Sequence, residues 1–356
     1  MSRRWGRVLL AGLLAYFALA VQAAPAARTE LPRNVELPVR VRLAVRVLNI
    51  AQVQEVAGEA RMFIETSQRW SDPRLRFDEV EVGKSRVDHV GDEAKDFLKT
   101  IWTPGLSADN QIGELQSSSV AVSAYANGDI VLVERYEGNF RVSMNMAAFP
   151  FDKQHLVASF SLPRYAKQEA VLVATEADRQ VSGVEDNLSV MDWQPLGLRF
   201  SNDEVSGWNA RSYSRLNATV TIERLSERFI LRIFIPIVAV LLVSVFVLWT
   251  PALQARDKGN LIFSSLLALA AISFTFESSF PGSISLNTPV AQMISLGYLY
   301  LVLVLMLDAV LTSRCNDTGS RHHGLYRVIK WHVNWVLPTL MTLICAGAAL
   351  RAVPPS

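Results

Sequence analysis

The first half of the chain alternates apolar and polar residues in a way that is typical of half-buried β-strands. The clearest runs are Val39–Val47, Ile130–Val133, Leu156–Phe160 and Asn217–Glu223. Turn signals separate such runs, at Ser71-Asp-Pro73, Asn127-Gly128 and Ser206-Gly207. Many short strands with turns between them predict an antiparallel, immunoglobulin-like β-sandwich from about residue 39 to residue 224.

The second half changes to long apolar runs, which predict a bundle of four transmembrane helices. The runs are Ile233–Ala255, Leu261–Phe276, Val290–Leu307 and Val333–Leu350. Pro236 lies in the first run, and proline is tolerated in membrane helices. We therefore predict an extracytoplasmic β-sandwich over residues 24–228 and a transmembrane domain over residues 229–356. Its spans are expected near residues 229–250, 259–279, 290–312 and 330–350.

The N-terminus has the pattern of a signal peptide over residues 1–23. Arg3, Arg4 and Arg7 give a basic start, Val8–Val21 is apolar, and Val21-Gln22-Ala23 permits cleavage. The alternative is an uncleaved membrane anchor, although the apolar run is short for a span. Both interpretations place the sandwich outside the cytoplasm.

The charges between the apolar runs predict the same orientation. The loops after the first and third runs contain basic residues, namely Arg256, Lys258, Arg314, Arg321, Arg327 and Lys330. The loop Pro281–Thr288 contains neither lysine nor arginine. Because basic loops remain cytoplasmic, the sandwich and the C-terminus should be extracytoplasmic, in a multi-pass protein of the cell membrane.

Composition narrows the function classes. Half of the residues are hydrophobic and the formal net charge is only +2, so we expect a lipid bilayer and not nucleic acid as a partner. Cys315 and Cys345 both lie in the apolar half, so no disulfide is expected in the sandwich. We find no catalytic constellation, and we expect no enzyme activity, no cofactor and no metal site.

The second apolar run contains a stripe of unusual chemistry. Steps of three and four residues place the following side chains on one helix face: Asp257, Asn260, Ser264, Leu267, Ala271, Phe274 and Ser278. A helix that lines water would carry such a face, whereas close helix–helix packing is the alternative for its small residues. Asp257 at the inner end and Glu277 at the outer end would form charged rings if subunits surrounded an axis.

One motif resembles a known family. Phe149-Pro150-Phe151-Asp152-Lys153-Gln154 resembles the signature loop of Cys-loop receptors, the pentameric ligand-gated ion channels. The flanking cysteines of eukaryotic members are replaced here by Val142 and Leu156, as in bacterial members. Further similar segments are Trp70-Ser-Asp72-Pro-Arg74-Leu75, Ile101-Trp102-Thr-Pro104, Asp257-Lys258, Leu267 as the gate leucine, and Pro281.

The resemblance implies a homopentamer in which a small-molecule agonist, or protons, opens a pore lined by the second helix. It also implies that binding is coupled to gating at the domain junction, through Glu55, Asp152, Arg224, Phe149, Pro150, Phe151 and Pro281. Agonist would bind between neighbouring sandwiches, with candidate residues Arg164, Tyr165, Trp208, Arg211 and Tyr213. Aromatic side chains can hold amines, whereas the two arginines would favour a carboxylate.

The stripe indicates that the permeant ions are cations. Asp257 continues the stripe, whereas the flanking Arg256 and Lys258 do not, because a helix turns about 100° per residue. Arg256 counts against this interpretation if the inner end of the helix unwinds. The rival function is a membrane-anchored extracytoplasmic binding or sensor protein without a conducting pore, which leaves the polar stripe unexplained.

Overall fold

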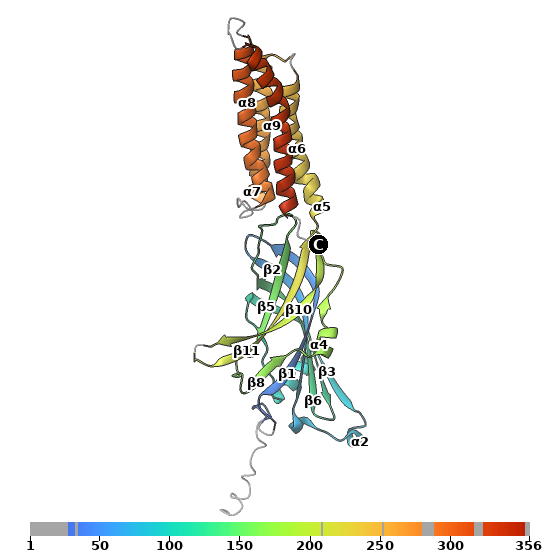
Figure 1. Cartoon of the computed structure of the whole chain (residues 1–356). Coiled ribbons are helices and arrows are strands. Elements are labelled where there is room, and N and C mark those ends of the chain that lie inside the picture. The colour runs from blue at the N-terminus through green and yellow to red at the C-terminus, as the bar shows by residue number, and fades with distance from the viewer. Residues whose placement is uncertain are drawn as a thin grey trace, which may run out of the picture.

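The computed structural model describes residues 28–32, 35–207, 209–250, 253–279, 288–316 and 323–352. A sheet-rich domain forms one end of an elongated molecule and a helical bundle forms the other (Figure 1). The predicted signal peptide, Trp208, Pro281 and Arg321 lie outside the described residues. The end of α9 (His323–Ala352) lies beside the sheet-rich domain, so the last helix returns to the domain junction.

The N-terminal domain contains two sheets. The seven-stranded sheet has the order β3-β5-β6-β2-β1-β8, with β9 paired to β1. The four-stranded sheet has the order β10-β11-β7-β4. The strands are β1 (Val39–Gln54), β2 (Glu59–Ser71), β3 (Arg86–Val90), β4 (Ser107–Ala108), β5 (Gln111–Tyr125), β6 (Asp129–Arg141), β7 (Lys153–Ser161), β8 (Ala170–Val173), β9 (Gly183–Val184), β10 (Trp193–Ser206) and β11 (Ser212–Arg224).

Alternation along the strands builds the core between these sheets. In β1, Leu43, Val45 and Val47 are buried, while Arg40 and Arg46 between and beside them are exposed. Trp70 and Trp102 pack edge to face inside the domain, with ring centroids 6.0 Å apart. The two positions of the missing loop cysteines, Val142 and Leu156, are buried in this same core.

The end of β2 shows why the segment Trp70–Leu75 keeps its shape. The buried carboxylate of Asp72 accepts hydrogen bonds from the backbone N–H of Arg74 at 3.1 Å and from its guanidinium at 2.7 Å. These bonds cap the turn η1 (Pro73–Leu75). Gly128 faces it with a φ of +89°, and a Cβ there would lie 2.8 Å from the carbonyl oxygen of Asp72. The turn therefore requires glycine at this position.

The helices follow the sheets. Short helices within the sandwich are α2 (Glu79–Val82), α3 (Asp92–Thr100) and α4 (Glu176–Gln180). The C-terminal domain contains α5 (Ser226–Phe229), the π-helical turn η2 (Ile230–Phe234), α6 (Ile235–Trp249), α7 (Ala255–Ser279), α8 (Pro289–Asn316) and α9. Among the described residues, four segments are long and apolar enough to cross a membrane: Ser226–Trp249, Ala255–Ser279, Pro289–Cys315 and Gly324–Gly347. The predicted fold class, a sheet-rich domain followed by four such helices, is confirmed.

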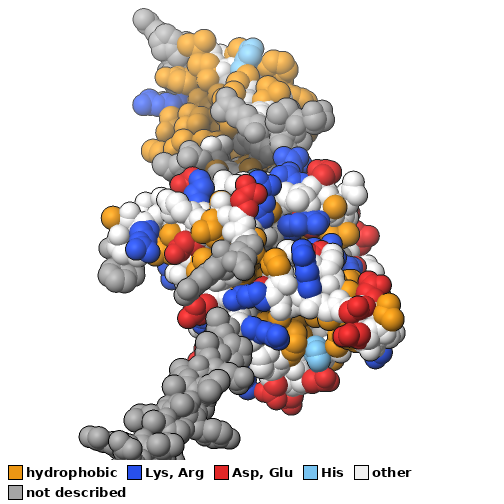
Figure 2. Space-filling view, turned by 90° about the horizontal axis from the view of Figure 1, so that it is seen from below, with side chains coloured by type: hydrophobic (Ala, Val, Ile, Leu, Met, Phe, Trp, Pro, Cys, Tyr) orange, Lys and Arg blue, Asp and Glu red, His pale blue; other side chains and the backbone are white. Residues whose placement is uncertain are grey.

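The two domains differ in the chemistry of their surfaces. Hydrophobic side chains dominate the visible surface of the helices, whereas basic and acidic side chains are interspersed over the sandwich (Figure 2). A second hydrophobic core lies within the helices and also includes Phe149 of the sandwich. The hydroxyl of Tyr300 on α8 and that of Ser244 on α6 lie 2.9 Å apart inside the bundle. α8 and α9 both extend beyond the predicted spans, because their polar ends continue the helices past the apolar runs.

Candidate functional site: the domain junction and one face of α7

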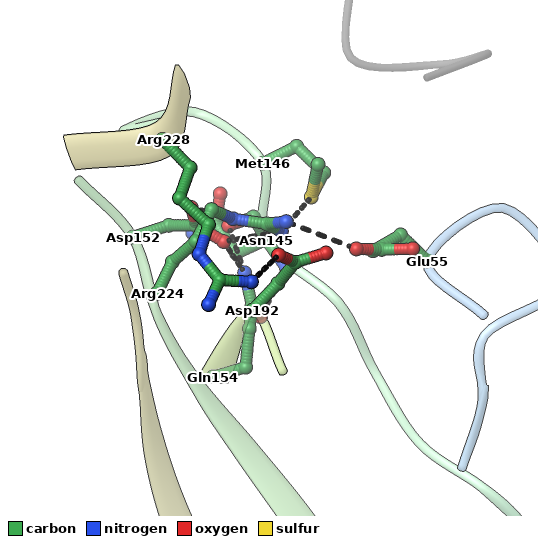
Figure 3. Close-up of polar contacts among 8 residues, drawn as sticks. All are labelled: Glu55, Asn145, Met146, Asp152, Gln154, Asp192, Arg224 and Arg228. Atoms are coloured by element: carbon green, nitrogen blue, oxygen red, sulfur yellow. Dashed lines mark hydrogen bonds and ion pairs between the residues drawn. The ribbon is translucent and has the colours of Figure 1, made fainter. Parts of the chain in front are cut away.

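A buried ion-pair cluster lies where the sandwich meets the helices (Figure 3). Arg224, the last residue of β11, donates from Nε to Oδ1 of Asp152 at 2.7 Å and from Nη2 to Oδ2 at 3.2 Å. Its Nη1 also contacts Oε1 of Glu55 at 3.0 Å. The side chains of Arg224 and Asp152 are 1% and 0% exposed, so this bidentate pair is shielded from water.

Neighbouring polar groups fix the Asp152 carboxylate in place. The side-chain amide of Gln154 donates to Oδ2 of Asp152 at 2.6 Å and to the carbonyl of Asn145 at 2.8 Å. The backbone N–H of Arg224 donates to the Asp152 carbonyl at 3.2 Å. These bonds tie the loop before β7 to the end of β11.

Aromatic rings surround the Arg224 guanidinium. Its Cζ lies 4.0 Å from the ring centroid of Trp193, 4.8 Å from that of Phe149 and 5.4 Å from that of Phe229. The face of an aromatic ring attracts a cation, and this attraction strengthens when water is excluded. Trp193 and Phe229 were not predicted from the sequence. Trp193 stands at the start of β10 opposite Arg224, so only the strand register brings the two residues together.

The signature loop contacts the membrane-length helices directly. The Phe149 ring packs against Phe229 at 5.3 Å and against Phe276 on α7 at 5.6 Å between centroids. Phe151 lies 6.4 Å from Phe234 of η2. Pro150 between them is buried. The loop therefore connects the Arg224 cluster to two helices of the bundle.

The helix α7 has one exposed face and one buried face. Every residue of the predicted stripe is exposed in the single chain: Asp257, Asn260, Ser264, Leu267, Ala271, Phe274 and Ser278, with Glu277 exposed beside it. Leu267 and Phe274 are each 74% exposed. Lys258, Ser265 and Leu269 are buried against the rest of the bundle. That α7 lines a pore stays a prediction, because this arrangement concerns one subunit.

The predicted agonist residues fall into two groups. The ring of Tyr165 packs against Trp102 at 5.5 Å, so it is partly in the core, while Arg164 is exposed and covers Gly105. Tyr213 is half-buried and receives a hydrogen bond from the Asn209 amide at 2.9 Å, whereas Arg211 is exposed. Of these side chains, Tyr213 lines a cavity.

A cavity of about 330 Å³ lies beside Tyr213, and it is lined by Asp109, Ser161, Pro163, Val205, Gly207, Tyr213 and Arg215. Asp109 and Arg215 were missed from the sequence. Asp109 accepts a hydrogen bond from Ser161, and Arg215 is paired with Asp203 across the hairpin. The bond from Arg215 keeps the pKa of the Asp203 carboxyl below its usual value. Alternation along β11 could have placed Arg215 on the outward face of the strand, because the buried Ser214 and Leu216 flank it.

A sheet-rich N-terminal domain is joined through a buried charged cluster to four helices of membrane-spanning length. The family model described as the neurotransmitter-gated ion-channel ligand binding domain matches residues 26–226, more than half of the chain. The chain belongs to this family of ligand-gated ion channels. Its members are not enzymes, in agreement with the sequence.

Several relatives are similar to this chain at low identity. The neuronal acetylcholine receptor subunit alpha-5 of Rattus norvegicus is 19% identical over 78% of this chain and 59% of its own length. The pH-sensitive chloride channel 2 of Drosophila melanogaster is 23% identical over 59% of this chain and 41% of its own length. The gamma-aminobutyric acid receptor subunit beta of Caenorhabditis elegans is 22% identical over 64% of this chain and 41% of its own length. The matched region thus spans between 41% and 59% of these relatives' lengths.

Proposed function

We propose that this protein forms a homopentameric, ligand-gated, cation-conducting channel in the cell membrane. The observation that carries this proposal is the exposed face of α7. Asn260 and Ser264 are exposed in the first half of a membrane-length apolar helix. Polar side chains of a membrane helix face a protein interior or a water-filled cavity, not lipid. Five copies of α7 around a central axis would enclose a water-filled pore, and these polar side chains would face it.

The order of residues along this face gives each a role in the pore. Asp257 would form a ring at the inner mouth, and Glu277 would form one at the outer end. Leu267 would form a ring of bulky apolar side chains that closes the pore by excluding water. Asn260 and Ser264 would offer dipoles that replace part of the hydration shell of a cation.

The junction provides a route from the sandwich to the pore. An agonist that changes the contact between two sandwiches would move β11, and with it Arg224. The Arg224–Asp152 pair would pass this motion to the signature loop. Phe149 in that loop is packed on Phe276 of α7, so the pore helix would respond. Glu55, which also contacts Arg224, would link the β1–β2 turn to the same motion.

The cavity beside Tyr213 supports an agonist that carries a carboxylate. Within the part of the chain that the structure describes, the buried Nε of Arg215 has no hydrogen-bond partner. A buried unpaired donor is costly, and an anionic ligand would satisfy it. The exposed Arg164 and Arg211 lie on nearby segments and add to the attraction. The neighbouring sandwich would complete the site.

The membrane orientation follows from the basic residues of the loops. Arg256 and Lys258 at the start of α7, with Arg314 at the end of α8, support a cytoplasmic location for these helix ends. The sandwich and the end of α9 lie at the opposite end of the bundle, near each other (Figure 1), and would be extracytoplasmic.

Purified full-length protein in planar bilayers tests this function. We expect discrete unitary currents that rise on addition of agonist, with a screen of carboxylates and amines at several pH values. Native mass spectrometry in mild detergent should give a mass of five subunits. Monomers or dimers alone, or bilayers that remain silent under every condition, would favour a binding or sensor protein instead.

A further inference from the structure

A second buried ion pair lies at the other end of the bundle, far from the junction. Lys258 on α7 and Asp308 on α8 are 3.2 Å apart, from Nζ to Oδ1. Their side chains are only 6% and 7% exposed. Lys330 on α9 lies 3.7 Å from the same oxygen and donates to the Thr312 hydroxyl at 2.7 Å. Three helices therefore meet around one carboxylate.

Asp308 is unexpected at its position in the sequence. It follows the uncharged run Val290–Leu307 and precedes Ala309-Val310-Leu311. A charged residue in such a membrane helix is costly and is retained where it has a partner and a role. Its carboxylate faces two lysines, so the small cluster carries a net positive charge. Lys330, with 25% of its side chain exposed, can reach water, whereas Lys258 cannot.

The consequence concerns the inner mouth of the proposed pore. Asp257 and Lys258 are neighbours, but the first is exposed on the stripe and the second points into its own subunit. A lysine has a long flexible stem and extends its ammonium to the nearest water or carboxylate. Without Asp308, Lys258 would lose its carboxylate partner inside the subunit, and its stem would be free to extend toward the pore water and the adjoining Asp257. Five lysine side chains at the inner mouth would cancel the negative charge of the five Asp257 carboxylates.

We propose that Asp308 is a selectivity-determining positioning residue. It holds the Lys258 ammonium inside each subunit, so that only Asp257 contributes charge to the inner mouth. This inference rests on the proposed cation channel. It adds that the selectivity of the mouth depends on a residue of α8 that does not itself face the stripe.

Reversal potentials in asymmetric NaCl test the role of Asp308. The variant Asp308→Asn should lower the cation-to-chloride permeability ratio and the unitary cation conductance several-fold, because Lys258 is released toward Asp257. The double variant Lys258→Gln/Asp308→Asn should restore both values. Lys330→Met is the matched control, since it removes a charge from the cluster without releasing Lys258, and it should conduct like the wild type. An Asp308→Asn channel with unchanged selectivity and conductance would overturn the proposal.

Thiol labelling tests the position of Lys258 without requiring current or an Asp308 variant. In a Cys315→Ser/Cys345→Ser background, Asp257→Cys and Lys258→Cys are treated with aminoethyl methanethiosulfonate and followed by mass. We expect the Asp257→Cys protein to react at least about tenfold faster, because the other thiol is buried. Equal rates would place both residues at water and refute the inference. Silent bilayers combined with unequal rates would instead count against the proposed channel function alone.

Discussion

The ring of Phe149 lies 5.6 Å from the ring of Phe276, and this contact joins a loop of the sandwich to the helix α7. Phe149 is fully buried although it belongs to a loop, and it packs with the hydrophobic core of the helices. The same ring lies 4.8 Å from the Arg224 guanidinium. One side chain thus contacts both the charged cluster and the proposed pore helix.

Replacement of Phe149 should therefore disturb both stability and gating. Phe149→Ala removes a buried ring, which typically costs about 3–5 kcal/mol of folding free energy. We expect a lower unfolding midpoint and, in channels that assemble, agonist responses shifted to higher concentration. Phe151→Ala is the comparison, because Phe151 lies in the same loop but is only half-buried, with its ring 6.4 Å from that of Phe234. Equal effects of the two variants would deny Phe149 a special role.

Arg224→Ala should abolish gating while agonist binding remains measurable. The substitution leaves the fully buried Asp152 carboxylate without its cationic partner, which costs about 3–5 kcal/mol when a buried pair is broken. Surface expression and radioligand binding would be measured together with current. Arg228→Ala is a matched control, since Arg228 forms an exposed pair with Asp192 at 3.3 Å and such pairs contribute at most about 1 kcal/mol. Normal gating in the Arg224 variant would remove the cluster from the coupling route.

Leu267→Ser should raise the basal current or the agonist sensitivity. Leu267 is 74% exposed on the stripe, and a ring of serines would keep the narrow part of the pore wet. Leu303→Ser on α8 is the control, because Leu303 is also exposed but lies outside the stripe. Whole-cell current without agonist, normalised to surface protein, is the measurement. An unchanged basal current and an unchanged dose–response curve would reject Leu267 as the gate.

The sequence predicted the elements that follow from periodicity. The alternation of Val39–Val47 lies in β1, and the second, third and fourth apolar runs lie in α7, α8 and α9. The first run, Ile233–Ala255, begins in η2 and fills α6, but α6 ends at Trp249, before the run does. It also named Glu55, Asp152 and Arg224 as one cluster, although these residues are up to 169 positions apart. That grouping came from a family resemblance, because periodicity carries no information on contacts between distant segments.

Two contacts could not be deduced from periodicity. Trp193 covers Arg224 only because β10 and β11 pair in a particular register. Lys258 and Asp308 meet only because α7 and α8 pack side by side with a particular rotation. The signal for the second contact was present, namely a single aspartate at the end of an uncharged run. Its partner could have been any of several basic residues near the same ends of the helices, such as Arg256, Lys258 and Lys330.

The carboxyl of Glu134 predicts a pH dependence of stability. Burial raises the pKa of Glu134, and the hydrogen bond from the Gln68 amide at 2.9 Å offsets only part of this shift. The folded protein therefore binds the proton more tightly than the unfolded chain. Its contribution to stability is present below the unfolded pKa and declines as pH rises toward the folded pKa.

Glu134→Gln should accordingly raise the thermal unfolding midpoint at neutral pH by a few degrees, because no charge is then buried. The difference from the wild type should shrink at about pH 4, where most ordinary carboxyls begin to protonate. Glu137→Gln, on the same strand but paired with Arg61 at an exposed position, serves as the control. A larger difference at low pH than at neutral pH would contradict the assigned direction.

Asp257→Ala should reduce the preference for cations. Five carboxylates at a narrow mouth with low-dielectric walls concentrate cations and exclude anions. Asp257 is exposed on the same face as Asn260 and Leu267, whereas Lys258 is bonded to Asp308 inside the subunit. Arg256 is exposed as well, one residue before Asp257, so the loss of Asp257 would leave a basic residue near the mouth. The preference should therefore weaken more than neutralisation of the mouth alone would cause.

The measurement is the reversal potential in asymmetric NaCl. For the wild type we expect a value close to the sodium equilibrium potential, and for Asp257→Ala a shift toward that of chloride. The double variant Arg256→Gln/Asp257→Ala separates the effects of the two charges. Its reversal potential should lie between that of the wild type and that of Asp257→Ala, because the exposed Arg256 is then also removed. Glu277→Gln at the outer end should reduce the unitary conductance more than the selectivity, since Glu277 lies at the opposite end of α7 from Asp257. A wild-type reversal near the chloride potential would reject cation conduction, and an unshifted Asp257→Ala would place the selectivity filter elsewhere on α7.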